Sequence, residues 1–245
     1  MALFGTHDSM DQCTETNHGI SMYYSVPYVR GDPRFRAPTK WNYQKLESRP
    51  FYDRANFDVA LYLEAHSSEI IAEYQDAVKD KLRTHPDTRT EVASGKWQWM
   101  QLYGIGGRND QVCAKLPKTA AVVDSLPINI PFGFVFFSQM SPGTHITRHT
   151  GSSNLRIRLH LGVDVPSQEP DGTPFSQKIR VGTQAQGWSS GKVLTFDDAF
   201  EHELTYNSSL PRTVLLVDVS LLLIVAPVAA DVLPQPDLTR SSTSF

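Results

Sequence analysis

The stretch that decides the fold runs His145-Ile-Thr-Arg-His149-Thr-Gly151 and continues, after two serines, as Asn154-Leu-Arg-Ile-Arg-Leu-His160-Leu-Gly162. From residue 154 to residue 161 polar and apolar side chains alternate, as they do in a β-strand whose two faces meet different surroundings. The even positions carry Asn, Arg, Arg and His, and the odd positions carry Leu or Ile. The pattern predicts a strand with one polar and one apolar face.

The polar face of this strand has two interpretations. If it lines the interior of a barrel, Arg156 and Arg158 need anionic partners, because a guanidinium stays charged and is costly to bury alone. A small dianionic ligand would meet that need. The same face could also turn to solvent at an open sheet edge, and the strand by itself leaves both interpretations open.

Two histidines of the same region are candidate metal ligands. His149 and His202 each lie beside a turn, on segments that could meet at one end of a barrel. Two imidazoles suit a divalent iron, manganese or zinc ion, and non-haem iron sites commonly add one carboxylate. The position two residues after the first histidine, where that carboxylate often stands, is Gly151. Either Asp197 or Asp198 supplies the carboxylate or water takes its place, and two unrelated structural histidines are the alternative.

The rest of the chain predicts a mainly β protein with flanking helices. We expect strands near residues 96–103, 132–138, 155–163, 179–181, 192–196 and 213–219, separated by Pro-Gly, Asp-Gly and Ser-Gly turns. Several short strands at this spacing indicate a barrel or jelly roll. Apolar residues at helical spacing predict a helix over Ser68–Leu82, and shorter helices are expected over Asp58–Ala65 and Ala120–Ser125. The long helix is expected to cover one face of a sheet.

Composition excludes several classes of protein. With 245 residues and a formal net charge of −3, the chain suits one large domain and shows no basic excess that would favour nucleic acid. Two distant cysteines, Cys13 and Cys113, fit a reducing compartment. The N-terminus lacks the features of a signal peptide, and the apolar run 214–228 is too short and too interrupted to span a bilayer. We therefore expect a cytoplasmic protein.

The expected organisation is one domain between two polar ends. Residues 1–40 are predicted to form an arm that is partly disordered or lies on the domain, and residues 234–245 a mobile tail. The domain is expected over residues 41–233, with a helical cover at about 56–85 and a β core at about 96–225.

Taken together, these motifs resemble the catalytic domain of the aspartyl/asparaginyl β-hydroxylases, which are iron- and 2-oxoglutarate-dependent oxygenases with a double-stranded β-helix core of the cupin type. The resemblance covers roughly three quarters of the chain, back to about Leu46. Its motifs, in family order, are Ser138-Gln-Met-Ser-Pro-Gly-Thr-His145, His149-Thr-Gly151, Asn154 to Gly162, Trp188-Ser-Ser-Gly191-Lys-Val, Phe196-Asp-Asp198, His202-Glu203 and Arg212.

The resemblance implies roles for individual residues. Iron would be bound by His149 and His202, and the family also has glycine at the position of Gly151. 2-Oxoglutarate would be held by Ser138, Arg158, His160 and Arg212, with Tyr103 standing where the family tends to have Trp. Asp198 and Glu203 are expected to orient a metal-bound histidine, and His145 and Arg156 are candidates to face the substrate.

The implied reaction is the hydroxylation, or another oxidation, of an unactivated C–H bond. It would use Fe(II), 2-oxoglutarate and O₂, with ascorbate as a possible supporting reductant, and release succinate and CO₂. The chain lacks the helical-repeat domain of the animal enzymes, and Ser220-Leu221-Leu222 replaces the family's Trp-His after the last strand. We therefore expect a small molecule, an amino acid or a peptide as substrate. A non-catalytic small-molecule-binding barrel, an iron halogenase and, less favoured, a zinc hydrolase are the alternatives.

Overall fold

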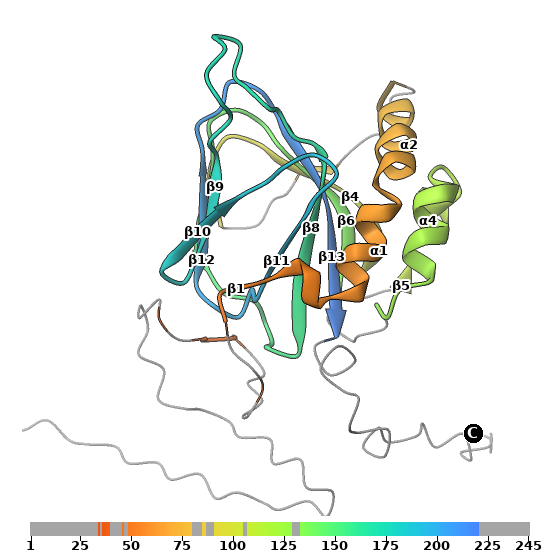
Figure 1. Cartoon of the computed structure of the whole chain (residues 1–245), viewed down its shortest axis with the longest axis horizontal. Coiled ribbons are helices and arrows are strands. Elements are labelled where there is room, and N and C mark those ends of the chain that lie inside the picture. The colour runs from red at the N-terminus through yellow and green to blue at the C-terminus, as the bar shows by residue number, and fades with distance from the viewer. Residues whose placement is uncertain are drawn as a thin grey trace, which may run out of the picture.

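Two antiparallel β-sheets face each other, and helices cover the outer side of the larger sheet (Figure 1). The structure is a computed structural model that describes residues 34, 36–39, 46, 49–79, 85–86, 91–104, 107–128 and 133–220. This arrangement confirms the predicted jelly-roll core with flanking helices.

The larger sheet has, within the described residues, the strand order β1-β11-β8-β13-β6-β4-β2, with β5 paired to β4. Apolar residues at alternate positions explain why most of these segments form strands. Their bounds are Phe51–Tyr52 (β1), Val193–Phe196 (β11), Arg156–Asp164 (β8), Arg212–Ser220 (β13), Val135–Met140 (β6), Trp97–Gly104 (β4), His85–Pro86 (β2) and Gly107–Arg108 (β5).

The smaller sheet carries both candidate metal ligands. Its order is β10-β9-β12-β7-β3 in the described chain. The bounds are Gln184–Gly187 (β10), Lys178–Val181 (β9), His202–Tyr206 (β12), Thr144–His149 (β7) and Val92–Ser94 (β3). The sequence did not predict β7 and β12 as strands.

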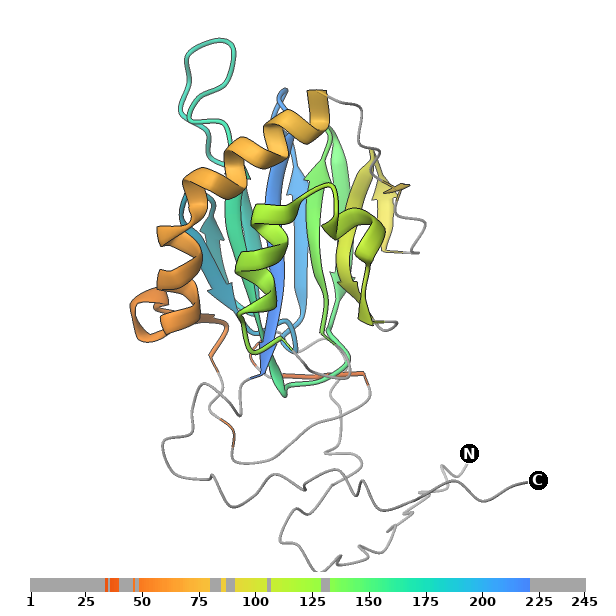
Figure 2. The ribbon, with the colours of Figure 1, turned by 90° about the vertical axis from the view of Figure 1, so that its right-hand side faces the viewer.

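The helices lie together on one face of the larger sheet, as Figure 2 shows. They are the short 3₁₀ helix Arg54–Asn56, then Asp58–Ala65 (α1), Ser67–Lys79 (α2), Asp110–Cys113 (α3) and Pro117–Asp124 (α4). The helix α4 begins with proline, which is preorganised for a first turn. Its next two N–H groups donate to the Glu73 carboxylate of α2, at 2.8 Å from Lys118 and 2.7 Å from Thr119. The helices that cover the sheet therefore include α4, which lies within the range predicted as β core, as well as the helices within the predicted range 56–85.

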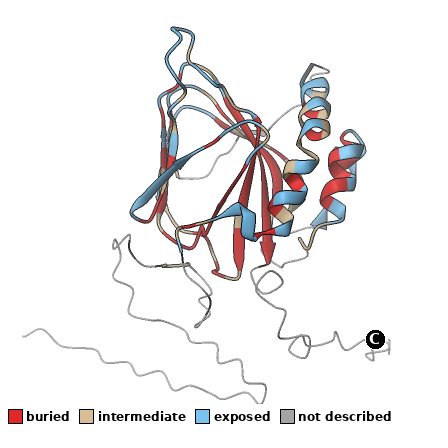
Figure 3. Ribbon diagram, viewed as in Figure 1, coloured by how far each residue is buried: buried red, intermediate tan, exposed pale blue. Residues whose placement is uncertain are grey.

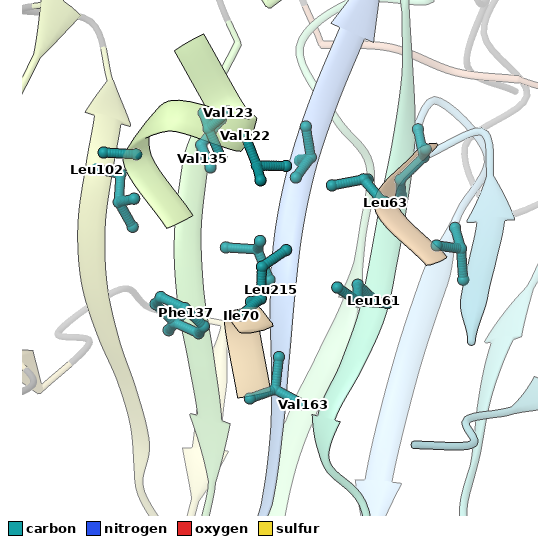
Figure 4. Packing of buried hydrophobic residues seen from close by; sticks show 14 of the residues in the cluster. Leu63, Ile70, Leu102, Val122, Val123, Val135, Phe137, Leu161, Val163 and Leu215 are labelled. Atoms are coloured by element: carbon teal, nitrogen blue, oxygen red, sulfur yellow. The ribbon is translucent and has the colours of Figure 1, made fainter. Parts of the chain in front are cut away.

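Strand alternation divides the buried side chains into two clusters. The outer cluster lies between the helices and the larger sheet and contains Leu63, Ile70, Val123, Leu161 and Leu215, among others (Figure 4). The inner cluster lies between the two sheets and includes Phe136, Phe196 and Leu216. Burial is concentrated in the strands of the larger sheet, whereas β10 is exposed (Figure 3). The polar face of β8 belongs to the inner side, so the interior interpretation of that face is correct.

A segment from the predicted N-terminal arm crosses the lower end of the barrel (Figures 1 and 2). Residues 36–39 bind there through backbone hydrogen bonds: Ala37 N donates to Ala199 O at 2.8 Å and Thr39 N to Gly151 O at 3.0 Å. Arg36 forms a β-bridge with Phe200. We call residues 36–39 the strap; the rest of residues 1–40, except Arg34, and all of 234–245 lie outside the described residues. No helix in the described part of the chain is long and apolar enough to cross a membrane.

Candidate active site

His149 and His202 lie opposite each other on β7 and β12. They form a cross-strand pair, and their ring centroids are 4.1 Å apart. Nδ1 of His149 lies 2.8 Å from Thr147 O, and Nδ1 of His202 lies 2.9 Å from Phe200 O. A carbonyl only accepts, so each Nδ1 carries the proton and each Nε2 keeps a lone pair for a metal.

A β-bulge brings His149 to the inner side. His202 pairs with His149, and Leu204 pairs with Ile146. The two pairs are therefore two residues apart on β12 but three residues apart on β7, which carries the extra residue. Ile146 belongs to the inner cluster, and without the bulge a residue three positions later would point outward. The bulge therefore allows both Ile146 and His149 to face the interior. His145, beside Ile146, is thereby placed on the outer side, away from any substrate in the barrel.

The position two residues after the first histidine leaves no room for a side chain. A Cβ atom on Gly151 would lie 2.5 Å from the Asp198 carboxylate. The described residues contain no group of three or more His, Cys, Asp or Glu side chains that could hold a metal ion. The candidate metal ligands that the structure brings together are therefore the two histidines. Burial, with His149 alongside, holds the pKa of His202 well below its usual value, which keeps the imidazole neutral and able to ligate.

Asp198 bonds to arginines rather than to a histidine. Its carboxylate accepts from Arg156 Nη2 at 2.6 Å and lies 3.1 Å from Arg158 Nη1. Burial alone would raise the pKa of Asp198, but the two guanidinium groups hold it well below its ordinary value. Glu203 lies outside the barrel and pairs with Arg148 and Arg180. The orienting role predicted for these two acids falls instead to the backbone carbonyls of Thr147 and Phe200.

Arg156 and Arg158 share a second buried carboxylate, that of Asp218. Arg158 Nε and Nη2 donate to Asp218 at 2.8 Å and 3.0 Å, and Arg156 Nη1 lies 3.4 Å from it. Two guanidinium groups and two carboxylates therefore form a buried quartet. The anionic partners expected for Arg156 and Arg158 are thus supplied by the protein itself.

Arg212 is in a different situation. Its Nε and Nη1 atoms are buried without a hydrogen-bond partner in the described structure. Its guanidinium lies 4.1 Å from the centre of the Trp188 ring, and Nη2 contacts the Met140 sulfur at 3.2 Å. Burial lowers the pKa of Arg212 to about 10, so the group is still charged at neutral pH. A charged group buried in this way calls for an anion.

His160 adds a second donor to the same place. Trp188 Nε1 donates to His160 Nδ1 at 3.2 Å, and His160 Nε2 has no partner among the described residues. Burial, with Arg212 and Arg158 nearby, holds the pKa of His160 well below its usual value. A neutral imidazole that accepts at Nδ1 carries its proton on Nε2. The tautomer set by Trp188 thus presents a second unused N–H donor.

Ser138 completes the donor set. Its hydroxyl accepts from Trp97 Nε1 at 2.9 Å, so its own hydrogen is available to donate. Arg212, His160 and Ser138 all lie on the inner face of the larger sheet and all offer donors. This set fits the carboxylates of 2-oxoglutarate, as the two histidines fit Fe(II).

Tyr103 is the prediction that the structure corrects most clearly. The register of the β4–β6 pairing shifts at the segment from Gln101 to Tyr103. As a result, Tyr103 packs against the outer cluster. Its hydroxyl donates to Asp124, and burial together with that carboxylate raises the pKa of Tyr103 to about 12. Trp97, on the same strand, contacts Ser138 instead. Trp97 and Trp99 share the inner face of the strand, which was the available signal for an inner aromatic residue, but the register shift before Tyr103 cannot be read from the sequence.

These features place the chain among the jelly-roll oxygenases. A family model for aspartyl/asparaginyl beta-hydroxylase matches residues 64–221. The chain belongs to the aspartyl/asparaginyl β-hydroxylase family.

Three relatives show how far the similarity extends. The human aspartyl/asparaginyl beta-hydroxylase is 36% identical over 147 residues, which cover 58% of this chain and 18% of that protein. The ornithine lipid ester-linked acyl 2-hydroxylase of Rhizobium tropici is 36% identical over 182 residues, covering 72% and 62%. Human aspartate beta-hydroxylase domain-containing protein 2 is 31% identical over 209 residues, covering 78% and 52%. The chain spans less than two thirds of each relative's own length.

Proposed function

We propose that the protein is an Fe(II)- and 2-oxoglutarate-dependent dioxygenase that hydroxylates an unactivated C–H bond and releases succinate and CO₂. The observation that carries the proposal is the buried Arg212, whose unpaired donors lie in the same barrel as two paired histidines whose Nδ1 atoms face backbone carbonyls. A metal site and an anion site are both needed for this chemistry, and few other functions need both.

The roles of the residues follow from their contacts. His149 and His202 would hold the metal through Nε2. Arg212 would bind the distal carboxylate of 2-oxoglutarate, with Ser138 and His160 donating to other oxygens of the cosubstrate. When bound, iron and 2-oxoglutarate together supply the oxidising power for the C–H bond. A contact from Arg158, implied by the family resemblance, stays a prediction.

The rest of the barrel protects and orients these groups. The Thr147 and Phe200 carbonyls fix the ring orientation of both histidines, and Trp188 fixes the tautomer of His160. The inner cluster excludes bulk water, which strengthens each charged contact. A halogenase would use the same two histidines and is the related alternative. Zinc hydrolysis gives Arg212 no role.

Relatives within the family are named for different substrates. The names of the relatives point to aspartyl or asparaginyl residues in one case and to a lipid acyl chain in another. A small molecule, an amino acid and a peptide are all compatible with the proposed chemistry.

Turnover of 2-oxoglutarate tests the proposal directly. Purified protein supplied with Fe(II), ascorbate, O₂ and 2-oxoglutarate should form succinate, and His202→Ala should abolish it. Equal succinate from both proteins would refute the metal site. Arg212→Ala should raise the KM for 2-oxoglutarate by at least about tenfold, because a charged hydrogen bond is lost; an unchanged KM would refute the assigned anion site.

A further inference from the structure

The two candidate metal ligands stand at the ends of their strands. His149 is the last residue of β7, and His202 is the first residue of β12. Among the described residues, the backbone bonds on the β3 side of β7 reach Thr147. A residue at the end of a strand is held by the sheet on one side along the chain and by a turn on the other. The separation of the two imidazoles therefore depends on the turns that adjoin them.

The strap binds the turn after His149 (Figures 1 and 2). Thr39 N donates to Gly151 O at 3.0 Å, and Gly151 follows His149 by two residues. Gly151 N in turn donates to Asp198 O at 2.6 Å. The backbone of Gly151 thus lies between the strap on one side and the turn before His202 on the other.

The strap also binds the turn before His202. Ala37 N donates to Ala199 O at 2.8 Å, and Arg36 forms its β-bridge with Phe200. Phe200 O is the acceptor that lies 2.9 Å from His202 Nδ1. The strap therefore fixes the backbone on which the orientation of the His202 ring depends.

Side-chain contacts anchor the strap itself. Arg36 Nη2 donates to Leu46 O at 2.9 Å, and Arg36 Nη1 lies 3.4 Å from Asp197 Oδ2. The two side chains of this ion pair are 10% and 0% exposed. Separating a buried ion pair leaves an uncompensated charge and is costly. The strap is therefore held in one place and can support the two turns it binds.

We propose that the strap is a positioning element of the metal site, which holds the turns at Gly151 and Phe200 at the separation that lets both imidazoles bind one ion. This inference rests on the metal site of the proposed function and adds to it a segment more than 100 positions away in the sequence. Strap docking and metal binding are then coupled, and such a coupling acts equally in both directions. Loss of strap contacts weakens metal binding, and bound metal strengthens strap docking.

Backbone substitutions in the strap test the first direction. Ala37→Pro removes the N–H beside Phe200, and Ala37→Ser keeps it; Thr39→Pro removes the N–H that donates to Gly151, and Thr39→Ala keeps it. Calorimetric titration of the metal-free full chain with Co(II), a divalent ion that imidazole also binds, gives the Kd. We expect each proline variant to bind Co(II) at least about fivefold more weakly than its control, as for loss of one hydrogen bond.

Glu73→Ala separates positioning from a general loss of stability. It removes an acceptor in the helical layer on the outer face of the larger sheet and is expected to destabilise the fold there. The variant should have a lower Tm, as the proline variants should, but should bind Co(II) with the native Kd. Weakening of Co(II) binding by Glu73→Ala to the same extent would show that affinity follows stability, and would overturn the positioning role.

Limited proteolysis of the native chain tests the second direction without a strap variant. Trypsin cleaves after arginine, so the bond between Arg36 and Ala37 is a cleavage site inside the strap. Saturating Co(II) should slow cleavage at this bond, followed by mass spectrometry, at least about fivefold, because the coupling factor is the same in both directions. His202→Ala should remove the protection. Equal cleavage rates of the native chain with and without Co(II) would overturn the coupling.

The outcomes separate the two proposals. If native protein binds Co(II) and forms succinate with Fe(II), but the proline variants bind Co(II) as tightly as their controls, the role of the strap is overturned and the dioxygenase function stands. If native protein binds no Co(II), the metal site is refuted, and both proposals with it.

Discussion

Arg158 and Arg212 look alike in the sequence and differ completely in their surroundings. The first is neutralised by carboxylates that lie 40 or more positions away along the chain, and the second is left with a stacked indole and a thioether. The family resemblance implied that both arginines hold 2-oxoglutarate. The difference between a structural arginine and an anion-binding arginine lies in its partners, and these become visible only in three dimensions.

Asp197, beside the quartet, gives stability a pH dependence of its own. Burial raises its pKa to about 7, with Arg36 opposing the shift. An unfolded chain releases this proton near pH 4, so the folded state binds more protons between about pH 4 and about pH 7. The free energy of unfolding is therefore expected to fall as the pH rises through this window.

Asp197→Asn should remove that part of the pH dependence. The amide oxygen of the variant can still accept from Ala199 N, which donates to Asp197 at 2.9 Å in the native protein. Urea denaturation at several pH values measures the free energy of unfolding of both proteins. As the pH rises from about 4 to about 7, the value for the native protein should fall relative to that for the variant by at most about 1.4 kcal/mol per pH unit. Parallel curves for the two proteins would contradict the raised pKa.

At the scale of elements, β-bulges explain where the sequence prediction succeeded and failed. Strands β8, β11 and β13 and helices α1, α2 and α4 were predicted within a few residues, because their apolar residues follow regular periods. Strand β7, Thr-His-Ile-Thr-Arg-His, has a mainly polar sequence, and its bulge interrupts the alternation. The slip in β4 likewise moved Tyr103 to the outer side. Pairing irregularities are set by the neighbouring strand, so a single sequence does not reveal them.

The contact between Glu73 of α2 and the first turn of α4 is expected to stabilise the packing of the two helices. Glu73→Ala removes the acceptor of two N–H groups at the start of α4. We expect the free energy of unfolding to fall by about 1–2 kcal/mol, as for loss of a helix cap. Gln75→Ala, at an exposed position of the same helix, is the control. Equal stabilities of the two variants in chemical denaturation would argue against this capping role.

At the scale of the whole molecule, the strap joins residues 36–39 to the end of the barrel that carries His149 and His202. Thr39→Pro removes the N–H that donates to Gly151 O, whereas Thr39→Ala keeps it. We expect the proline variant to lose about 1 kcal/mol of stability relative to the alanine variant, seen as a lower Tm. Equal melting temperatures would show that this hydrogen bond contributes nothing.

The strap also sets an order of events during synthesis. Arg36 and its partner Asp197 are separated by 161 positions, so during synthesis the strap must wait for a segment that emerges long after it. Contacts between such distant positions form late, because a long loop must close first. Docking of the strap is therefore expected among the last steps of folding rather than among the first.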